Sequence, residues 1–189
     1  MHIMSVSDYG HLFYDPYVYG FDTDFFTVLS GTVSGASDKI RVNTGEANST
    51  MMFMYGDLTY SIAVPTAPTT GDDRTWGIYS KSMPDRNAAF FVIDGENFSA
   101  KTSGDNSANT ESTDIEWDSD WTDASTEFKI HWRIDRVQFS INGRVVATHF
   151  QVNIPKGKMT PMYFENANAD DMDIDYIEIN DAKNMYFIT

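Results

Sequence analysis

The sequence contains no cysteine, so disulfides, thiolate metal sites and cysteine nucleophiles are all excluded. Basic residues are scarce, because 13 Lys and Arg stand against 28 Asp and Glu and give a net charge of -15. This charge argues against binding nucleic acid through phosphate neutralisation and against binding an anionic membrane surface. No run of residues approaches the roughly 18 consecutive apolar residues of a membrane span. We therefore expect neither nucleic-acid binding nor membrane insertion.

Residues 1–8 lack the basic and then apolar pattern of a secretory signal peptide. Residues 1–22 form an aromatic-rich N-terminal arm, in which Tyr and Phe are mixed with Gly, Asp and Pro without a clean period. Such an arm either packs over its own domain or docks onto another subunit, because exposed aromatic residues mark contact surfaces. The hydrophobic content of 41% supports a core, and residues 23–189 are expected to form one domain.

Strand-like runs recur along the chain and are separated by clusters of Gly, Asn, Asp, Ser and Thr. No window carries the apolar i, i+3, i+4, i+7 pattern of an amphipathic helix, so any helix should be a single short turn. Many short strands with turn signals between them indicate a sandwich or jelly roll. The expected strands are residues 24–34, 39–43, 50–64, 75–82, 88–94, 97–102, 113–117, 127–134, 136–141, 144–151, 158–165 and 172–179.

Two dipeptides predict tight hairpins. Asn142-Gly143 lies between two alternating apolar runs, and a two-residue type I′ turn needs φ > 0 at both of its central positions. Asp94-Gly95 stands between the similar runs 90–93 and 98–100. Together with the strand pattern, these turns predict an all-β fold, a two-sheet antiparallel β-sandwich.

Six segments, taken in their order, resemble the concanavalin A-like lectin/glucanase superfamily, with jelly rolls of the laminarinase/lichenase type. The resemblance covers roughly residues 24–180 and implies two large antiparallel sheets, one convex and one concave, with saccharides bound on the concave face. The superfamily also includes non-catalytic modules of adhesins, toxins and virion proteins, so the fold alone leaves the function open. The segments are Tyr55–Ile62, Trp76–Ser80, Ala89–Ile93, Phe128–Trp132, Val137–Gly143 and Asp173–Ile179.

The glucanases that the chain resembles carry Glu-x-Asp-x-(x)-Glu on one inner strand, because retention needs two carboxyl groups about 5–5.5 Å apart. The nearest string here aligns Asp114 and Glu116 with the last two acids but puts Ser112 at the nucleophile position. The strand that better matches the catalytic one, residues 88–94, has Phe and Val there. A regular strand would instead turn the acids at 114, 116 and 118 to solvent and Ile and Trp inward. We expect no glycosidase activity.

A saccharide site needs an aromatic platform and polar groups for the hydroxyls. Trp121 is the best candidate platform, because the polar stretch 118–123 offers it no apolar neighbours, although a loop anchor is an equal alternative. Trp76 is a second candidate platform, whereas Trp132 alternates in phase with apolar residues and is expected in the core. The candidate ligand-binding residues are completed by three hydrogen-bonding side chains, Arg74, Arg86 and Asn87.

Calcium is the expected metal, since hard cations take oxygen ligands. The resemblance implies a structural Ca²⁺ held by backbone oxygens near the N-terminus and by an Asp of the closing strand, here Asp175 or otherwise Asp173. The alternative is a carboxylate that accepts hydrogen bonds from loop amides. The histidines show no metal-ligand spacing, and His131 and His149 are expected at the surface or in a groove.

These observations favour a non-catalytic jelly-roll surface module, a virion decoration or attachment protein of a phage head or tail that binds glycans. The reasoning is that lectin-type sandwiches work outside cells while this chain shows no export signal, and a virion protein satisfies both. The alternative is a carbohydrate-binding or degenerate glucanase domain of a secreted protein. Expected partners are a glycan or another protein subunit, with a homo-oligomer as one form, at a virion surface or outside cells.

Overall fold

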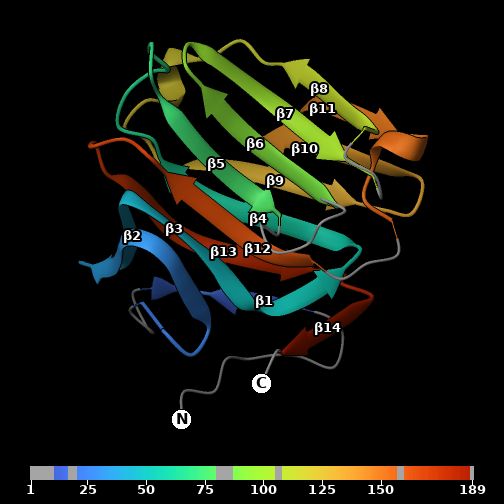
Figure 1. Ribbon diagram of the computed structural model, residues 1–189, viewed down its shortest axis with the longest axis horizontal. Coiled ribbons are helices and arrows are strands. Elements are labelled where there is room, and N and C mark those ends of the chain that lie inside the picture. The colour runs from blue at the N-terminus through green and yellow to red at the C-terminus, as the bar shows by residue number, and fades with distance from the viewer. Residues whose placement is uncertain (1–10, 17–20, 80–86, 105–107, 157–159, 188–189) are drawn as a thin grey trace.

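The computed structural model (Figure 1) describes residues 11–16, 21–79, 87–104, 108–156 and 160–187. In this part of the chain the secondary structure is almost entirely β, with two single-turn 3₁₀ helices, η1 (Ser119–Trp121) and η2 (Gln151–Asn153). No described helix has the length and apolar character needed to cross a membrane. The strands are β1 (Leu12–Tyr14), β2 (Phe26–Ala36), β3 (Lys39–Met54), β4 (Gly56–Ala63), β5 (Asp73–Ile78), β6 (Ala88–Asp94), β7 (Asn97–Ser103), β8 (Thr110–Asp114), β9 (Thr126–Trp132), β10 (Arg136–Ile141), β11 (Arg144–Phe150), β12 (Thr160–Asn166), β13 (Met172–Asn180) and β14 (Asn184–Phe187).

The strands form two antiparallel layers (Figure 1). One layer has the order β11-β10-β9-β4-β13, with β1 beside β13. The other has the order β12-β5-β6-β7-β8 and lies in front in Figure 1. The long strand β3 joins the layers, because its residues 40–42 pair with β13 and its residues 45–53 pair with β12. The predicted all-β antiparallel sandwich is confirmed.

Both predicted hairpins are confirmed. Asn142 and Gly143 have φ of 48° and 78° and join β10 to β11, with Ile141 paired to Arg144. The left-handed conformation at both positions is what a type I′ turn requires. The second hairpin joins β6 to β7, but Asp94 pairs with Asn97, so its two central residues are Gly95 and Glu96 and not the predicted Asp94 and Gly95.

Two expected strands were wrong: the strand expected at 113–117 overlaps β8 only at residues 113 and 114, and the strand expected at 50–64 is divided. Residues 50–64 are not a single strand, because β3 ends at Met54 and β4 begins at Gly56. Between them Tyr55 has φ of 51°, in the left-handed region, and this residue turns the chain. Conversely, the expected strand 39–43 continues through the polar stretch 44–49 into one strand of 16 residues. Single-sequence propensity missed this extension, since Gly, Asn and Thr are frequent turn residues.

The core lies between the layers and is rich in aromatic rings. Trp132 is fully buried as predicted, and its Nε1 donates to the carbonyl oxygen of Pro155 at 3.0 Å. The described part of the N-terminal arm also contributes. Leu12 and Tyr14 have no exposed surface, and the ring of Tyr14 stacks on Phe25 with centroids 5.2 Å apart. Residues 12–14 therefore pack on their own sandwich through β1.

Candidate functional site

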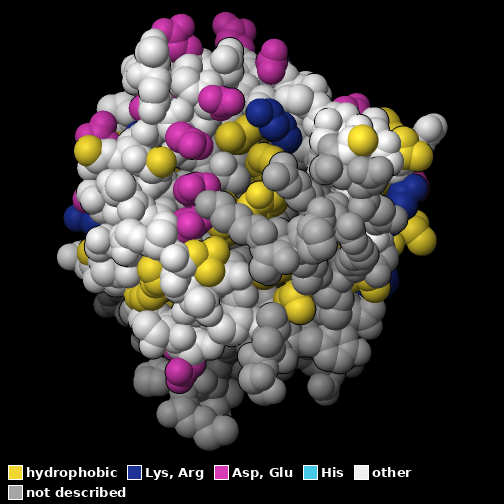
Figure 2. Space-filling view, in the orientation of Figure 1, with side chains coloured by type: hydrophobic (Ala, Val, Ile, Leu, Met, Phe, Trp, Pro, Cys, Tyr) yellow, Lys and Arg dark blue, Asp and Glu magenta, His cyan; other side chains and the backbone are white. Residues whose placement is uncertain are grey.

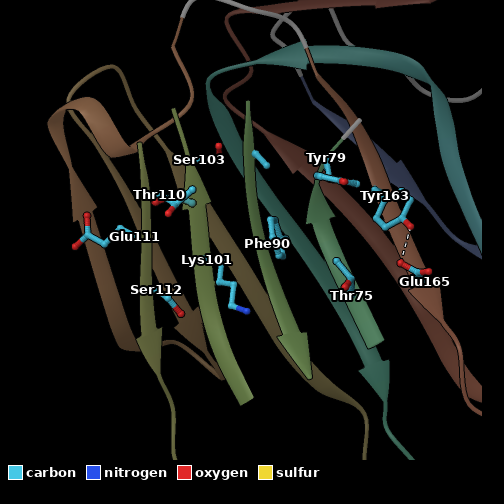
Figure 3. Close-up of a pocket in the computed structure, with 12 residues that line it drawn as sticks. Thr75, Tyr79, Phe90, Lys101, Ser103, Thr110, Glu111, Ser112, Tyr163 and Glu165 are labelled. Atoms are coloured by element: carbon cyan, nitrogen blue, oxygen red, sulfur yellow. Dashed lines mark hydrogen bonds between the residues drawn. The ribbon is translucent and has the colours of Figure 1, made fainter. Parts of the chain in front are cut away.

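A groove of about 420 Å³ is open on the outer face of the layer β12-β5-β6-β7-β8 (Figure 3). Its position follows from strand register. One row of cross-strand neighbours runs over all five strands and comprises Tyr163, Gly77, Phe90, Lys101 and Ser112. Alternate residues of a strand point to opposite faces, so this row and its neighbours form the floor of the groove.

Aromatic rings make up one end of this floor. The ring of Tyr79 lies 5.7 Å from that of Phe90 and 5.1 Å from that of Tyr163, both in edge-to-face geometry. Tyr79 and Phe90 are half-buried, so part of each ring faces the groove. Gly77 separates Phe90 from Tyr163 in the row, and a Cβ there would stand 2.4 Å from the carbonyl oxygen of Ala89. The absence of a side chain at this position keeps the floor low.

An acidic group stands beside Tyr163. Its hydroxyl lies 2.7 Å from a carboxylate oxygen of Glu46 and 2.7 Å from one of Glu165. Burial raises the pKa of Tyr163 far above its ordinary value, and the two neighbouring carboxylates raise it further, so the phenol stays protonated at neutral pH. Glu46 is buried and also accepts from the Ser30 hydroxyl at 3.0 Å. Only Glu165 of the two acids lines the groove.

The other end of the groove is polar. Lys101 follows Phe90 in the row, and Ser112 and Thr110 of β8 are exposed beside it. Glu111 lines this wall too, but its carboxylate accepts from Asn153 Nδ2 at 3.3 Å. In Figure 3, Glu165 and Glu111 lie at opposite sides of the groove. Figure 2 shows the same face, with apolar side chains gathered in a hollow, acidic side chains on one side of it and basic atoms on the other.

Most of the sequence-predicted ligand residues lie elsewhere. Trp76 is fully buried, with its ring centroid 4.9 Å from that of Phe128, so it presents no face to a ligand. Arg74 is also fully buried, and Asn87 is 3% exposed. The burial of these three side chains argues against the predicted ligand contacts; β5 turns residues 74 and 76 inward, and Asn87 lies just before β6. Arg86 lies outside the described residues.

Arg74 keeps a partner inside the molecule, since its Nη1 lies 3.2 Å from an Asp72 carboxylate oxygen. Burial lowers the pKa of Arg74, and the neighbouring carboxylates of Asp72 and Asp170 partly offset this effect. The guanidinium therefore serves as a buried ion-pair partner.

Trp121 is half-buried at the end of η1 and lines a second cleft, of about 530 Å³, between the segment after β8 and β11. Its ring packs edge-to-face on Trp117 at 5.6 Å and on Phe98 at 6.1 Å. The residue thus anchors its loop and also borders open space, and its use by a ligand stays a prediction. The acids 114, 116 and 118 are exposed, while Ile115 and Trp117 pack against the core, as the alternation predicted.

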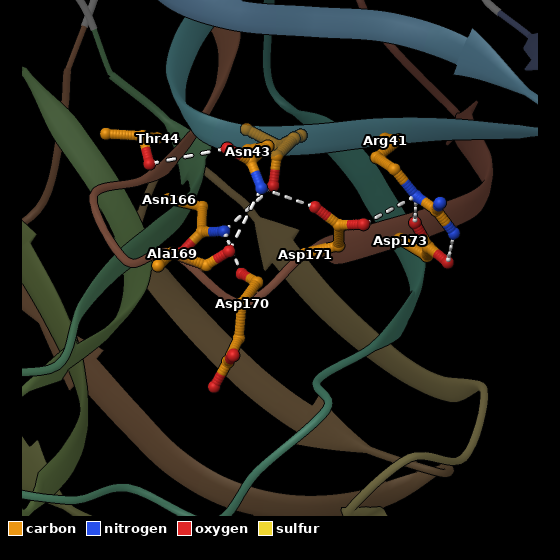
Figure 4. Close-up of polar contacts among 9 residues, drawn as sticks. Arg41, Asn43, Thr44, Asn166, Ala169, Asp170, Asp171 and Asp173 are labelled. Carbon is orange, nitrogen blue, oxygen red and sulfur yellow. Dashed lines mark hydrogen bonds and ion pairs between the residues drawn. The ribbon is translucent and has the colours of Figure 1, made fainter.

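Each of the two predicted calcium ligands is paired with a cationic side chain, and Figure 4 shows the pair of Asp173 with Arg41. Asp173 accepts from Arg41 Nε and Nη2, both at 2.9 Å, and these bonds raise the pKa of Arg41. Asp175 lies 3.2 Å from Lys39 Nζ and is also bonded to the Ser125 hydroxyl. No group of three or more His, Cys, Asp or Glu side chains is placed to hold a metal within the described ranges. The ion pairs of Asp173 and Asp175 disfavour calcium at these two carboxylates, and calcium binding stays a prediction.

The acid-rich segment 166–171 is instead held by hydrogen bonds and ion pairs (Figure 4). The buried Asn166 donates through Nδ2 to the carbonyl oxygens of Val42 at 2.8 Å and of Asp170 at 2.7 Å. Asn43 Nδ2 donates to Asp171 at 2.6 Å, and Arg41 lies 3.1 Å from the same carboxylate. Arg41 thus ties the segment to β3.

One histidine is also not where the sequence suggested. His149 is fully buried between Thr102 and Thr113, whose hydroxyls lie 2.8 and 2.9 Å from its two ring nitrogens. The expectation of a surface or groove position was wrong for this residue. His131 remains half-buried at the surface, 2.6 Å from the carboxylate of Asp57.

Tyr79 and Tyr163 were secondary candidates for the aromatic platform, behind the tryptophans, and the structure places both in the groove. The groove residues that the sequence analysis missed are Phe90, Lys101 and Glu165. Their strands were expected, and alternation could have placed each residue on one face of its own strand. The signal that brings these residues together is the pairing register of non-consecutive strands, which one sequence does not contain.

No known protein-family profile matches the chain, and no curated protein matches it in sequence. Solved structures do match it in fold. A Bacillus licheniformis beta-glucanase has a TM-score of 0.70 at 11% identity and covers 92% of this chain and 99% of its own. A Crh5 transglycosylase in complex with NAG has a TM-score of 0.72 at 14% identity, covering 97% and 94%. The Emp47p carbohydrate recognition domain has a TM-score of 0.68 at 10% identity, covering 93% and 96%.

Enzymes and a recognition domain therefore share this architecture at sequence identities that establish the fold alone. Together with the two antiparallel layers, these likenesses show that the chain has the concanavalin A-like lectin/glucanase jelly-roll fold, as the sequence resemblance predicted.

Proposed function

We propose that this protein is a non-catalytic carbohydrate-binding module that holds a saccharide in the groove over β12-β5-β6-β7-β8. The observation that carries the proposal is the groove floor, where Tyr79 and Phe90 offer half-buried rings between polar side chains. A sugar ring places its C–H face on an aromatic ring, while its hydroxyls bond to surrounding oxygen and nitrogen atoms. Thr75, Ser112 and Glu165 supply such atoms around the two rings.

The arrangement of acids supports a binding role over a hydrolytic one. Glycoside hydrolysis uses two carboxyl groups about 5–5.5 Å apart for retention and about 6.5–9.5 Å apart for inversion. Of the described acids, Glu165 and Glu111 line the groove, on β12 and β8. Three strands lie between β12 and β8, and a spacing of about 4.8 Å per strand puts their backbones about 19 Å apart. Asn153 binds the Glu111 carboxylate in addition.

Glucan-array binding by the intact protein tests this proposal, with the variants Phe90→Ala and Tyr79→Ala compared at equal folded fraction. We expect both variants to lose at least tenfold in affinity, because each removes a ring from the floor. Trp121→Ala is the matched control, since it removes an aromatic ring from the other cleft. Loss of binding in Trp121→Ala with no change in the groove variants would move the site to that cleft. Release of reducing sugar by the wild type would refute the non-catalytic part.

We also keep the proposal that the module acts on the surface of a particle, a phage head or tail. Its support is the composition, acidic and free of cysteine, which suits synthesis in a reducing cytoplasm followed by exposure to solvent. Co-sedimentation with capsid or tail protein, or assembly into a symmetric oligomer, is the expected result. A protein that stays monomeric and binds no virion component would favour the alternative, a carbohydrate-binding domain of a secreted protein.

A further inference from the structure

We infer that the groove selects glycans whose units carry a negative charge, a carboxylate or a sulfate ester, and that Lys101 is the residue that selects them. This inference rests on the proposed function and specifies its ligand. Lys101 lies next to Phe90 in the cross-strand row, one strand spacing of about 4.8 Å away. An anionic substituent of a sugar ring seated on Phe90 therefore lies within reach of the ammonium group.

Lys101 combines a side chain without an ion-pair partner with a place in the groove. Six of the ten described Lys and Arg side chains lie 2.8–3.2 Å from an Asp oxygen, namely Lys39, Arg41, Arg74, Lys129, Arg133 and Arg136. The other four form no ion pair with a described residue, namely Lys101, Arg144, Lys156 and Lys183. Of these four only the half-buried Lys101 lines the groove. An ammonium that lines a groove and pairs with no described carboxylate is available to an anionic group of a ligand.

The nearby acidic side chains do not pair with Lys101. Glu165 lies on β12, which is three strand spacings, or about 14 Å, from β7, the strand of Lys101. Glu111, on β8, is bound by Asn153, and Asp114 of the same strand lines the second cleft. The groove is thus dipolar, with an acceptor of sugar hydroxyl protons at Glu165 and a cation at Lys101. Because an ammonium is a compact point charge, it binds a carboxylate or a sulfate without strong preference.

The net charge of -15 does not remove this effect. At 0.15 M salt the Debye length is about 8 Å, so distant surface acids are largely screened. A contact between a sugar anion and Lys101 inside the groove is shorter than this length and persists.

Isothermal titration calorimetry at 0.15 M salt tests the inference with four probes: laminarihexaose as the neutral glycan, an oligomannuronate hexamer, a sulfated carrageenan hexamer and hexaglutamate. The variants are Lys101→Met, which keeps an apolar stem, Lys101→Arg, which restores the charge, and Lys183→Met. Lys183 is exposed and lies outside the groove, so its variant is the matched control for loss of one positive charge.

We expect at least one acidic hexasaccharide to bind the wild type more tightly than laminarihexaose. Lys101→Met should weaken that acidic ligand about tenfold, or about 1.4 kcal/mol, and change neutral binding less than twofold. Lys101→Arg should retain the preference, and Lys183→Met should not alter it. Equal losses for neutral and acidic glycans in Lys101→Met, or a preference for laminarihexaose, would overturn the inference while leaving glycan binding intact. Hexaglutamate binding as tightly as the acidic glycan would assign the groove to acidic peptides. Absence of binding by every saccharide would refute the proposed function itself.

Discussion

Acidification should destabilise the protein through the buried histidine that joins the two layers. His149 of β11 lies between Thr102 of β7 and Thr113 of β8, with both ring nitrogens within 2.9 Å of a hydroxyl oxygen. A neutral imidazole donates from one nitrogen and accepts at the other, and Thr hydroxyls serve both roles. Burial lowers the pKa of His149, and the charge of Glu111 offsets this only in part. The folded state therefore holds the neutral form.

The size of the effect follows from proton linkage. An unfolded histidine has a pKa of about 6.5, so below that pH the unfolded state binds a proton that the folded state excludes. The free energy of unfolding is thus highest above about pH 6.5 and falls as the pH drops toward the lowered folded pKa. The slope is at most about 1.4 kcal/mol per pH unit for one proton. Between pH 6.5 and 5.0 the loss reaches at most about 2 kcal/mol, against a typical stability of about 5–15 kcal/mol.

Urea unfolding of the wild type and of His149→Gln, at half-unit steps from pH 7.5 to 5.0, measures this loss. Gln keeps one donor and one acceptor but does not titrate. The carboxylates titrate in both proteins, so the difference in unfolding free energy between them isolates the histidine. We expect the unfolding free energy of the wild type to decrease relative to that of His149→Gln as the pH falls below 6.5. Parallel curves over the whole range would refute the argument that His149 is held neutral by burial.

Three further results are expected. Trp76→Ala should cost about 3–5 kcal/mol of unfolding free energy in denaturant titration, because it leaves a cavity among buried rings; a cost under about 1 kcal/mol would contradict its core position. Millimolar CaCl₂ or EDTA should leave the melting temperature unchanged, and a rise of the melting temperature with calcium would instead support a calcium site at Asp173 and Asp175. Arg41→Met should lower the melting temperature by a few degrees at most, since the exposed ion pairs of Arg41 each contribute under about 1 kcal/mol. Gly143→Ala should destabilise the protein by about 1 kcal/mol in thermal melts, because φ of 78° strains a residue with a Cβ. No atom lies within 4 Å of a Cβ added there, so an unchanged melting temperature would contradict the strain argument.

Local chemistry made much of the fold predictable. The Asn142-Gly143 turn follows from two residues whose backbones tolerate positive φ, and it fixes the register of β10 on β11. Period-2 alternation likewise placed Trp132 inside and the acids after β8 outside. The break at Tyr55 was not predictable in this way, since a left-handed tyrosine carries no sequence signature.

The buried residues of β5 show where charge was a misleading guide. Arg74 and Trp76 are two residues apart and so share a face, and an arginine usually indicates the solvent side. Here that face is the interior, because Asp72 supplies the ion pair that partly offsets the desolvation of the guanidinium. The sequence alone does not show this pairing, and both residues were consequently placed on the wrong face.

The groove floor joins the sequence resemblance to the proposed function. The resemblance aligns residues 88–94 with the strand on which the laminarinase/lichenase-type glucanases carry their acids, and Phe90 of this strand lies on the groove floor. A carboxylate at that position could take part in bond cleavage, whereas an aromatic ring offers an apolar platform without charge. Lys101, the cross-strand neighbour of Phe90, adds a cation to the same row. If the proposed function is correct, this row is suited to holding a charged saccharide, and the calorimetry with Lys101→Met tests that.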